Sequence, residues 1–388
     1  MFMNFADRRP ATRAVGSQNV PAVCGSFLFC LIVVAGLPGC DSSKSDASKP
    51  ATNQQQSIVG DSAVAVAGVE KLATSIKKDN AGNVSEVNFR GATIVDKDLE
   101  HLVGLTSVTS VLLNDTAISD DGLKTIGQLK SLRNLDLRGC AISDEGLAHL
   151  TQLTSLKAVR MSGESGATNV TDDGMVHVAK LTGLKVLAVD HLWVSEVGLE
   201  QLADLKLLEE LYMAKTTVGD DGLKIMQQFP KLRKLRISQT QISDSGMAEL
   251  EKLPGLVELD LSENAQLSDA GMKPLAALSA MQKLNLWRIP ITNDGVAHLT
   301  GLTNMKWLNL DNTLMSDDGL AHLAGMKQLE FLHIGSTAVS DAGLHQLEGL
   351  NALKDLRVTR TAVTEEGIAV LKSHLPETEI QLKYIEGQ

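Results

Sequence analysis

Six residues in the last third of the chain have side chains that could bind a ligand. They combine aromatic rings with an amide, a carboxylate and an imidazole: Trp287, Trp307, Asn309, Asp311, Phe331 and His333. Two of the three tryptophans of the protein are among them. Exposed tryptophans with polar neighbours are typical of binding interfaces, where a few such residues supply most of the binding energy.

Catalysis has less support than binding. Asp311, His333 and Ser336 could be drawn together as a hydrolytic trio, but an open sheet has no pocket that would exclude water from it. The sequence contains no G-x-S-x-G, P-loop, dinucleotide-binding, H-E-x-x-H or C-x-x-C motif. We therefore expect a non-enzymatic protein without a cofactor.

A period of about 24 residues runs through the chain and positions these side chains. The phrase Ile-Ser-Asp-Asp-Gly-Leu begins at residue 118, and close copies begin at residues 142 and 242. Its glycine recurs at residues 122, 146, 174, 198, 222, 246, 271, 295, 319, 343 and 367. An insertion at 163–169 lengthens one repeat and is either a tolerated bulge or a contact point. A period of this length indicates a repeat architecture.

Each repeat predicts one short strand and one short helix. Residues 132–140 alternate apolar and polar side chains, as a strand does, and leucines at 147, 150 and 153 share one helix face. Ser143 is placed to cap the helix. Gly146 is unfavourable within a helix, so we expect that neighbouring helices approach each other too closely there for a β-carbon. Because so small a unit cannot bury its own apolar face, successive repeats must stack strand beside strand.

The pattern L-x-x-L-x-L-x-x-[TNC]-x-[IV]-[ST]-D-x-G-L resembles the leucine-rich repeat family, in the cysteine-containing-like form common in bacterial surface proteins. The resemblance covers about residues 84–385. It implies an α/β solenoid, a right-handed horseshoe of about 12 repeats with a parallel sheet on the concave face and short helices on the convex face. It also implies that the concave face binds other macromolecules.

The sequence divides into five parts. We expect a lipoprotein-type signal peptide at 1–39, a disordered tether at 40–58, an N-terminal capping helix at 59–83, leucine-rich repeats at 84–373 and a C-terminal cap at 374–388. Caps are expected because stacking leaves the apolar faces of the terminal repeats open.

Side chains that alternate with the buried leucines form rows on the predicted concave face. One row alternates in charge through Glu210, Lys234, Glu258 and Lys283, and the row beside it includes Arg236 and Asp260. Adjacent strands would place opposite charges about 5 Å apart, as a self-neutralising ladder. Trp307 and Phe331 also share a row and are expected about 5 Å apart. Their rings either form a binding site or cover one another to shield the sheet.

Two repeated groups of side chains could be taken for metal ligands. Five histidines share one helix position, and pairs of acidic residues recur at the predicted helix starts. Helix centres about 10 Å apart are too distant for two of these histidines to share an ion, so we expect the histidines to face solvent. We expect the acidic residues to compensate the charge of the helix N-termini. No metal site is therefore predicted.

The N-terminus has the layout of an export signal. Three arginines precede Phe27–Leu37, an apolar run of about 11 residues that is too short to span a membrane. The run ends at Leu37-Pro38-Gly39-Cys40, which resembles the lipobox of bacterial lipoproteins, although Pro38 departs from the usual small residue. The resemblance implies lipidation at Cys40; simple secretion or an uncleaved anchor are the alternatives.

Charge and composition restrict the partner and the location. The net charge of −11 argues against nucleic acid as a partner. Residues 41–58 are almost free of apolar side chains, as a solvated tether requires. We expect an exported protein, lipid-anchored to the bacterial cell envelope and facing the periplasm or the cell surface. Its concave face would hold an unidentified protein or peptide; a glycan-binding or a structural envelope role are the alternatives.

Overall fold

The computed structural model describes residues 60–383. All of them belong to one compact unit, 57–388. The predictions for the signal peptide, the tether and Cys40 lie outside the described residues. Within residues 60–383, no helix has the length and apolar content needed to cross a membrane.

A single sheet of fourteen strands runs through residues 60–383, with the strands in chain order. β1 pairs with β2 in antiparallel orientation, and every later strand pairs with its successor in parallel. The strands are β1 Ser75–Lys78, β2 Val84–Asn88, β3 Ser110–Leu112, β4 Asn134–Asp136, β5 Ala158–Ser162, β6 Val186–Asp190, β7 Glu210–Tyr212, β8 Lys234–Arg236, β9 Glu258–Asp260, β10 Lys283–Asn285, β11 Trp307–Asn309, β12 Phe331–His333, β13 Asp355–Arg357 and β14 Glu379–Gln381.

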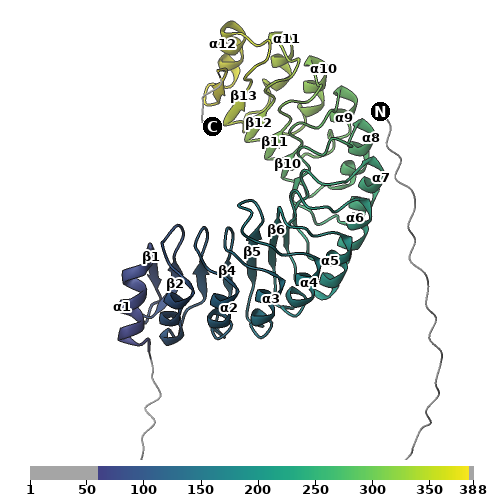
Figure 1. The fold of residues 1–388 in the computed structure, drawn as a ribbon. Helices are drawn as coiled ribbons and strands as arrows, with labels where there is room; N and C mark the ends of the chain where they lie inside the picture. Colours follow the sequence, from purple (N-terminus) through teal and green to yellow (C-terminus); the bar gives the residue numbers. More distant parts are fainter. Residues whose placement is uncertain (1–59, 384–388) are drawn as a thin grey trace, which may run out of the picture. The chain divides into compact units, whose positions relative to one another are not determined.

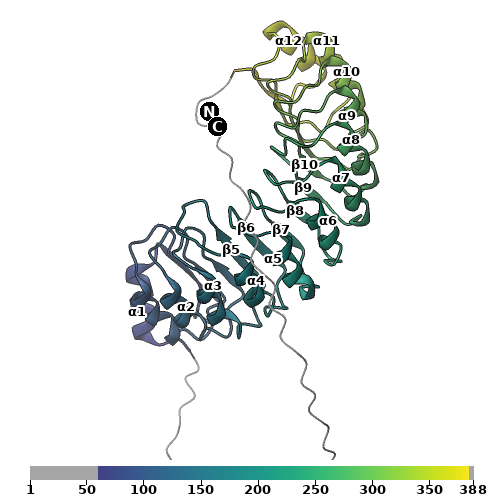
Figure 2. The same cartoon turned by 45° about the vertical axis from the view of Figure 1, so that its right-hand side comes forward.

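Short helices form a second layer against this sheet. The α-helices are α1 Ala63–Leu72, α2 Asp120–Ile126, α3 Asp144–Leu147, α4 Asp172–Val178, α5 Glu196–Gln201, α6 Asp220–Met226, α7 Asp244–Met247, α8 Asp269–Met272, α9 Asn293–Ala297, α10 Asp317–Leu320, α11 Asp341–Leu344 and α12 Glu365–His374. The 3-10 helices are η1 Asp96–Gly104, η2 Ala148–Leu150, η3 Leu202–Asp204, η4 Ala248–Lys252, η5 Lys273–Ala277, η6 Ala321–Leu323 and η7 His345–Leu347. Figures 1 and 2 show the strands on the inner side of the stack and the helices on its outer side.

The core lies between the two layers. Leu135 and Leu137 enter it from the strand side, and Leu147 and Leu150 enter it from the helix side; each is at most 2% exposed. Equivalent residues of every repeat join one continuous hydrophobic cluster. The predicted α/β solenoid is confirmed, because each repeat buries its apolar face only against its neighbours.

Both ends of the stack contain a strand that the sequence did not predict. At the N-terminal end, β1 follows the predicted helix α1 and closes the edge of the sheet. At the C-terminal end, α12 is followed by β14, which extends the parallel sheet. The β1 edge is charged: Lys77 pairs with Glu86 at 2.7 Å and Lys78 with Glu70 at 3.1 Å. Charged side chains on an edge strand discourage pairing with a further chain.

An aspartate at the start of most of the repeat helices joins neighbouring repeats. Asp220 Oδ1 accepts a hydrogen bond from the backbone N–H of Ser243 at 2.8 Å, and Asp220 Oδ2 accepts one from the Ser243 hydroxyl at 2.7 Å. The same pair of bonds joins Asp96 to Ser119, Asp120 to Ser143, Asp144 to Thr171, Asp172 to Ser195, Asp244 to Ser268, Asp269 to Thr292, Asp317 to Ser340 and Asp341 to Thr364. We call this series the aspartate ladder.

The aspartate ladder corrects one expectation about the helix starts and refines another. Ser143 occupies the N-cap position, but its hydroxyl bonds to Asp120 and Glu145 and makes no cap bond to the helix backbone. A β-carbon on Gly146 would meet the Asp120 carboxylate, with the carboxyl carbon at 2.6 Å. The recurrent glycine therefore makes room for the first residue of the neighbouring helix, as expected, and the atoms nearest to it are those of the ladder carboxylate.

Candidate ligand-binding face

The register of the sheet brings most of the proposed site residues together. Trp307 of β11 pairs with Phe331 of β12, and Asn309 pairs with His333. Asp311 follows β11 by two residues, so its side chain also points away from the hydrophobic core. It belongs to a third row of such side chains beside these two. Trp287 occupies the equivalent position after β10. These residues are partly exposed, and we call the surface that they form between β10 and β13 the aromatic face.

Trp307 and Phe331 stack on each other as their spacing predicts. Their ring centroids are 4.9 Å apart, and the planes are inclined by 5°. Lys283 Nζ lies 5.1 Å from the centre of the Trp307 ring, and Arg357 Cζ lies 5.1 Å from the centre of the Phe331 ring. Because these partners come from strands on opposite sides, both faces of each ring are covered. The rings therefore offer their edges, not their faces, to a ligand.

The cations that cover the rings are held in place by carboxylates. Lys283 pairs with Glu258 at 2.8 Å, and Arg357 pairs with Asp355 at 3.2 Å. Such pairs contribute little to stability at an exposed surface, but they fix the side chains over the rings. The sequence pattern did not suggest Lys283 or Arg357 as part of the site, although a step of one period from Trp307 and His333 leads to both.

Trp287 stands apart from the stack. Within residues 60–383 its ring makes no contact with another aromatic ring; it lies beside Arg288, whose Cζ is 5.4 Å from the ring centre. Arg288 in turn pairs with Glu263 at 3.3 Å. Trp287 therefore forms a second apolar point on the same surface.

The charge ladder is confirmed in one row and differs in the next. Glu210 pairs with Lys234 at 2.9 Å, and the Lys283 pair follows the same row. Arg236, however, pairs with Asp190, which lies two strands away, and not with the neighbouring Asp260. The Asp260 carboxylate instead accepts hydrogen bonds from the backbone N–H and the hydroxyl of Ser262 at 3.0 and 2.7 Å.

His333 and Asp311 lie side by side next to the Trp307–Phe331 ring pair. His333 Nε2 is 3.8 Å from Asp311 Oδ1, and the two side chains are 20% and 17% exposed. Burial lowers the pKa of His333 below its ordinary value; Asp311 opposes this shift and Arg357 adds to it. The imidazole is therefore mainly neutral at pH 7. Ser336, the third member of the hydrolytic trio, has no hydrogen bond to His333 among the described residues.

Two asparagine amides contribute donors to the same surface. Asn285 Oδ1 accepts from the N–H of Trp287 at 3.2 Å, and Asn309 Oδ1 accepts from the N–H of Asp311 at 2.9 Å. These bonds orient each amide so that its NH₂ group is the donor left for a ligand. A cavity of about 130 Å³ extends from Tyr212 to Trp307 and has Asn285 in its lining.

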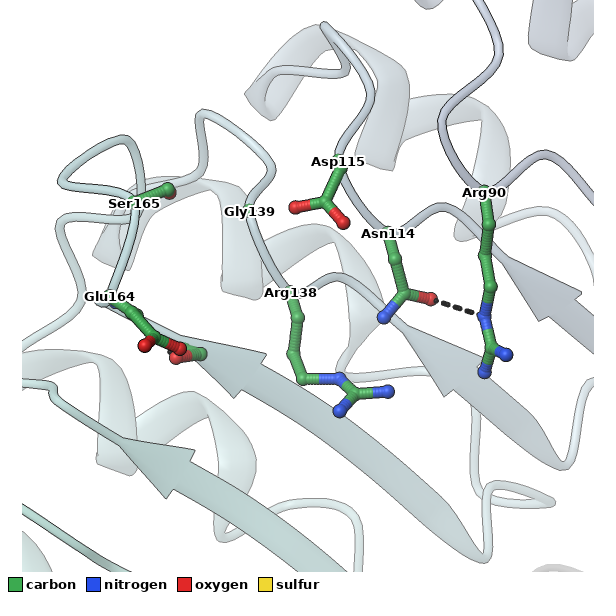
Figure 3. A pocket seen from close by; sticks show the side chains of 8 residues that line it. Arg90, Asn114, Asp115, Arg138, Gly139, Glu164 and Ser165 are labelled. Carbon is green, nitrogen blue, oxygen red and sulfur yellow. Dashed lines mark hydrogen bonds between the residues drawn. The ribbon is translucent and has the colours of Figure 1, made fainter. Parts of the chain in front are cut away.

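A larger cavity lies on the strand side near the N-terminal end of the stack (Figure 3). Its volume is about 440 Å³, and its lining includes Arg90 and Arg138. Glu164 and Ser165, from the insertion at 163–169, also line it, so the insertion forms part of a cavity wall. Beneath it, Asp136 pairs with Arg138 at 2.7 Å and with Arg90 at 3.5 Å.

Two charged groups of this larger cavity, Arg90 and Arg138, already have partners within the chain. Burial alone would raise the pKa of Asp136, but hydrogen bonds and charge from Arg138 outweigh it and hold the pKa below its ordinary value. Arg90 Nε also donates to Asn114 Oδ1 at 3.0 Å. The sequence did not indicate this cluster, because Asp136 is joined to Arg90 across two strands.

Comparisons with known proteins agree with this architecture. Residues 128–150, 230–250 and 254–276 match the model of the leucine-rich repeat family. No curated protein matches the chain. The structure of the internalin InlF from Listeria monocytogenes is 20% identical, with a TM-score of 0.59 over 83% of this chain and 94% of that one. At this identity the likeness supports the fold alone.

Two further solved structures are similar over parts of the chain. The internalin C2 of Listeria monocytogenes is 26% identical over 48% of this chain and 76% of that one, with a TM-score of 0.40. PEPR1, in a structure described as PEPR1-AtPEP1, is 15% identical over 80% of this chain and 50% of that one, with a TM-score of 0.44. The sequence period, the three matched segments and the solenoid together show that this chain has a leucine-rich repeat fold.

Proposed function

We propose that the protein binds a protein or peptide ligand on the aromatic face and has a binding rather than a catalytic role. The observation that carries the proposal is the Trp307–Phe331 stack. It lies on the side of the sheet that faces away from the hydrophobic core, with its ring edges accessible. Large rigid rings beside polar groups are typical of the centres of protein interfaces. Trp287, Asn309, Asp311 and His333 supply the remaining contacts.

The covered ring faces favour a peptide over a glycan. A sugar ring binds a tryptophan by stacking on its open face, whereas Trp307 has Lys283 on one side and Phe331 on the other. Ring edges beside the amide donor of Asn309 suit a peptide, which presents carbonyl oxygens and apolar side chains together. This argument supports a protein or peptide ligand.

A matched pair of tryptophan variants tests this proposal. Trp307→Ala removes the centre of the aromatic face, and Trp193→Ala removes a side chain that is 71% exposed in the turn between β6 and α5. Peptides selected from a displayed random library against the wild-type chain serve as probes. We expect Trp307→Ala to weaken their binding at least tenfold with a nearly unchanged melting temperature, and Trp193→Ala to change neither.

Other outcomes would overturn the proposal in distinct ways. A large loss of stability with unchanged binding in Trp307→Ala would assign the stack to shielding the sheet. A glycan array bound by the wild type, but not by Trp307→Ala, would replace the peptide with a glycan. Self-association of the purified chain in size-exclusion chromatography, lost on changing Trp307, would favour a structural role in the envelope.

The second part of the proposal is a lipid anchor at Cys40 that holds the repeats outside the cytoplasm, at the bacterial cell envelope. It rests on the basic start, the apolar run and the lipobox-like end of residues 1–40. Each buried methylene of an acyl chain contributes about 0.8 kcal/mol, so two or more chains make attachment stable. We expect Cys40→Ser to move the protein from the membrane fraction to the soluble fraction. A Cys40→Ser variant that stays in the membrane fraction would contradict the anchor.

A further inference from the structure

The geometry points to a subsite for a lysine side chain of the bound peptide, formed over Gly335 by Asp311, His333 and Thr359. This inference rests on the proposed function, because it assigns one chemical group of the peptide that the aromatic face would bind. It adds a charge requirement to a surface so far described by its rings.

The missing side chain of Gly335 lets three polar atoms converge. Gly335 lies two residues beyond β12, in the same outward row as Asp311 and Thr359 of the flanking repeats. A β-carbon at Gly335 would be 2.8 Å from Asp311 Oδ1, 2.8 Å from Thr359 Oγ1 and 2.9 Å from His333 Nε2. These three atoms therefore surround a single point at the surface of the sheet.

The fold leaves these polar groups largely unsatisfied. Thr359 is 6% exposed, and its hydroxyl has no hydrogen-bond partner within residues 60–383. The Asp311 carboxylate is 17% exposed, and its partner among those residues is His333 at 3.8 Å, which is too long for a hydrogen bond. No buried side-chain nitrogen or oxygen atom in the described part of the chain lacks a hydrogen-bond partner, so these unpaired groups reach solvent. A ligand that brings N–H donors to this point can replace their water contacts with direct hydrogen bonds.

Within residues 60–383, the ionisable side chain that pairs with Asp311 is His333. The described cations beside it are engaged, since Lys283, Arg288 and Arg357 pair with Glu258, Glu263 and Asp355. Asp190 occupies the same repeat position nearer the N-terminus, and there Arg236 supplies the charge. Arg357 holds the equivalent position two strands from Asp311, but it pairs with Asp355, so a ligand cation can take the place that Arg236 fills beside Asp190.

A primary ammonium fits this site better than other cations. It is a compact charge with three N–H donors, and a separation of 3.8 Å between Asp311 Oδ1 and His333 Nε2 allows one nitrogen to reach both atoms. A guanidinium is a planar fork that suits a single carboxylate. No group of three or more metal-ligating side chains occurs among the described residues. The net charge of −11 attracts basic peptides to the chain.

The test compares peptide and protein changes in one cycle. Displayed random peptides, with acetylated N-termini, are selected against the wild-type chain, and each lysine of a bound peptide is replaced by norleucine or by arginine. We expect one lysine whose replacement by norleucine weakens binding at least tenfold in the wild type and less than twofold in Asp311→Asn. Thr359→Val should reduce the affinity of the lysine peptide about threefold or more.

Asp260→Asn is the matched control, because it removes the same charge while an amide oxygen can still accept the two bonds from Ser262. It should leave the norleucine effect intact. Selected peptides that depend on Trp307 but contain no critical lysine would overturn this inference alone, as would peptides in which arginine binds equally well. If no selected peptide depends on Trp307, the proposed function fails and this inference fails with it.

Discussion

The aspartate ladder and the aromatic face come from the same repeat but use it in opposite ways. The ladder places the same residues in nearly every copy, and each aspartate satisfies the N-cap of the next repeat. The aromatic face changes its residue at every step, from Lys283 through Trp307 and Phe331 to Asp355. Interactions between neighbours hold a solenoid together, whereas variation at outward positions creates local chemistry without disturbing them.

Two departures within the ladder show what it requires. Asn293 replaces the aspartate in one repeat, and its Oδ1 still accepts from the N–H of Ser316 at 2.8 Å. Glu196 replaces it in another, where it accepts from the N–H of Gly219. All these side chains have an oxygen that accepts a hydrogen bond from the backbone N–H of the next N-cap residue. The ladder therefore requires this acceptor and does not require a charge.

The largest effect is expected on breaking the ladder. Asp220→Ala leaves the N–H and the hydroxyl of Ser243 without their acceptor. Losing two bonds to a charged group at a partly buried position should lower the free energy of unfolding by about 2–3 kcal/mol. Urea denaturation followed by circular dichroism measures this change.

The next residue provides the control for that prediction. Asp221 is exposed in the first turn of the same helix, where its charge faces the helix dipole. Asp221→Ala should therefore cost less than about 1 kcal/mol. Equal losses in Asp220→Ala and Asp221→Ala would show that the ladder acts through helix charge and not through bonds between repeats.

The same glycine substitution should act differently in the two regions. At Gly246 a β-carbon would meet the Asp220 carboxyl carbon at 2.8 Å and its α-carbon at 2.9 Å, so Gly246→Ala displaces a ladder residue. We expect a loss of about 2 kcal/mol in unfolding free energy, since the lost bonds exceed the gain of about 1 kcal/mol in helix propensity.

At Gly335 the atoms in the way are the ends of three side chains, which can move. Gly335→Ala should cost less than about 1 kcal/mol, within the range of surface substitutions that break no network. It should nevertheless weaken peptide binding about tenfold, because the three acceptors are spread apart. Similar unfolding midpoints for Gly246→Ala and Gly335→Ala would remove the distinction between the two regions.

Acidification should destabilise the aromatic face through His333. Burial lowers the pKa of this histidine in the folded chain, so the unfolded chain takes up a proton at a higher pH than the folded chain. The stability contributed by the neutral ring is full above the ordinary pKa of 6.5 and is lost as the pH falls through the lowered folded value.

His333→Gln removes this titration and tests its effect. The charged groups that act on His333 are Asp311, Asp355 and Arg357. The wild type should lose more stability than His333→Gln between pH 7 and pH 5, and peptide binding should weaken over the same interval because an imidazolium repels the lysine ammonium. Parallel pH profiles of the two proteins would contradict this assignment.

The sequence was sufficient for the register of the sheet. A period read from the glycines placed Trp307 beside Phe331, because parallel strands of equal repeats must align residues that are one period apart. The same alignment brings Asn309 beside His333 in the structure. The pairing of Trp307 with Phe331 could be predicted from the repeat length alone, which can be read from the spacing between successive copies.

The side-chain contacts could not be obtained in the same way. Asp220 bonds to Ser243 at an offset of 23 residues, and Arg236 reaches Asp190 over two strands. Such pairs depend on side-chain direction and on the twist of the stack, which a period does not encode. The convergence over Gly335 was missed for the same reason: a glycine in an outward row carries no chemical signal until its neighbours are placed.

The smallest expected effect concerns the one N-cap of the ladder that lacks a side chain. Gly219 stands where the other repeats have serine or threonine, and its N–H donates to Glu196. Its backbone is extended, with φ at −117°, and a β-carbon there would come no closer than 3.4 Å to a neighbouring atom. Serine therefore fits without strain, and its hydroxyl can satisfy a further backbone N–H of α6.

Gly219→Ser should raise the free energy of unfolding by a few tenths of a kcal/mol, the usual difference between serine and glycine at an N-cap. Gly219→Ala is the matched control, because it restricts the unfolded backbone to the same extent but adds no hydroxyl. A gain in the serine variant alone identifies the missing cap bond as the cause. A gain of equal size in both variants would show that chain entropy, and not the ladder geometry, limits stability at this repeat. Peptide binding at the aromatic face should stay unchanged in both variants.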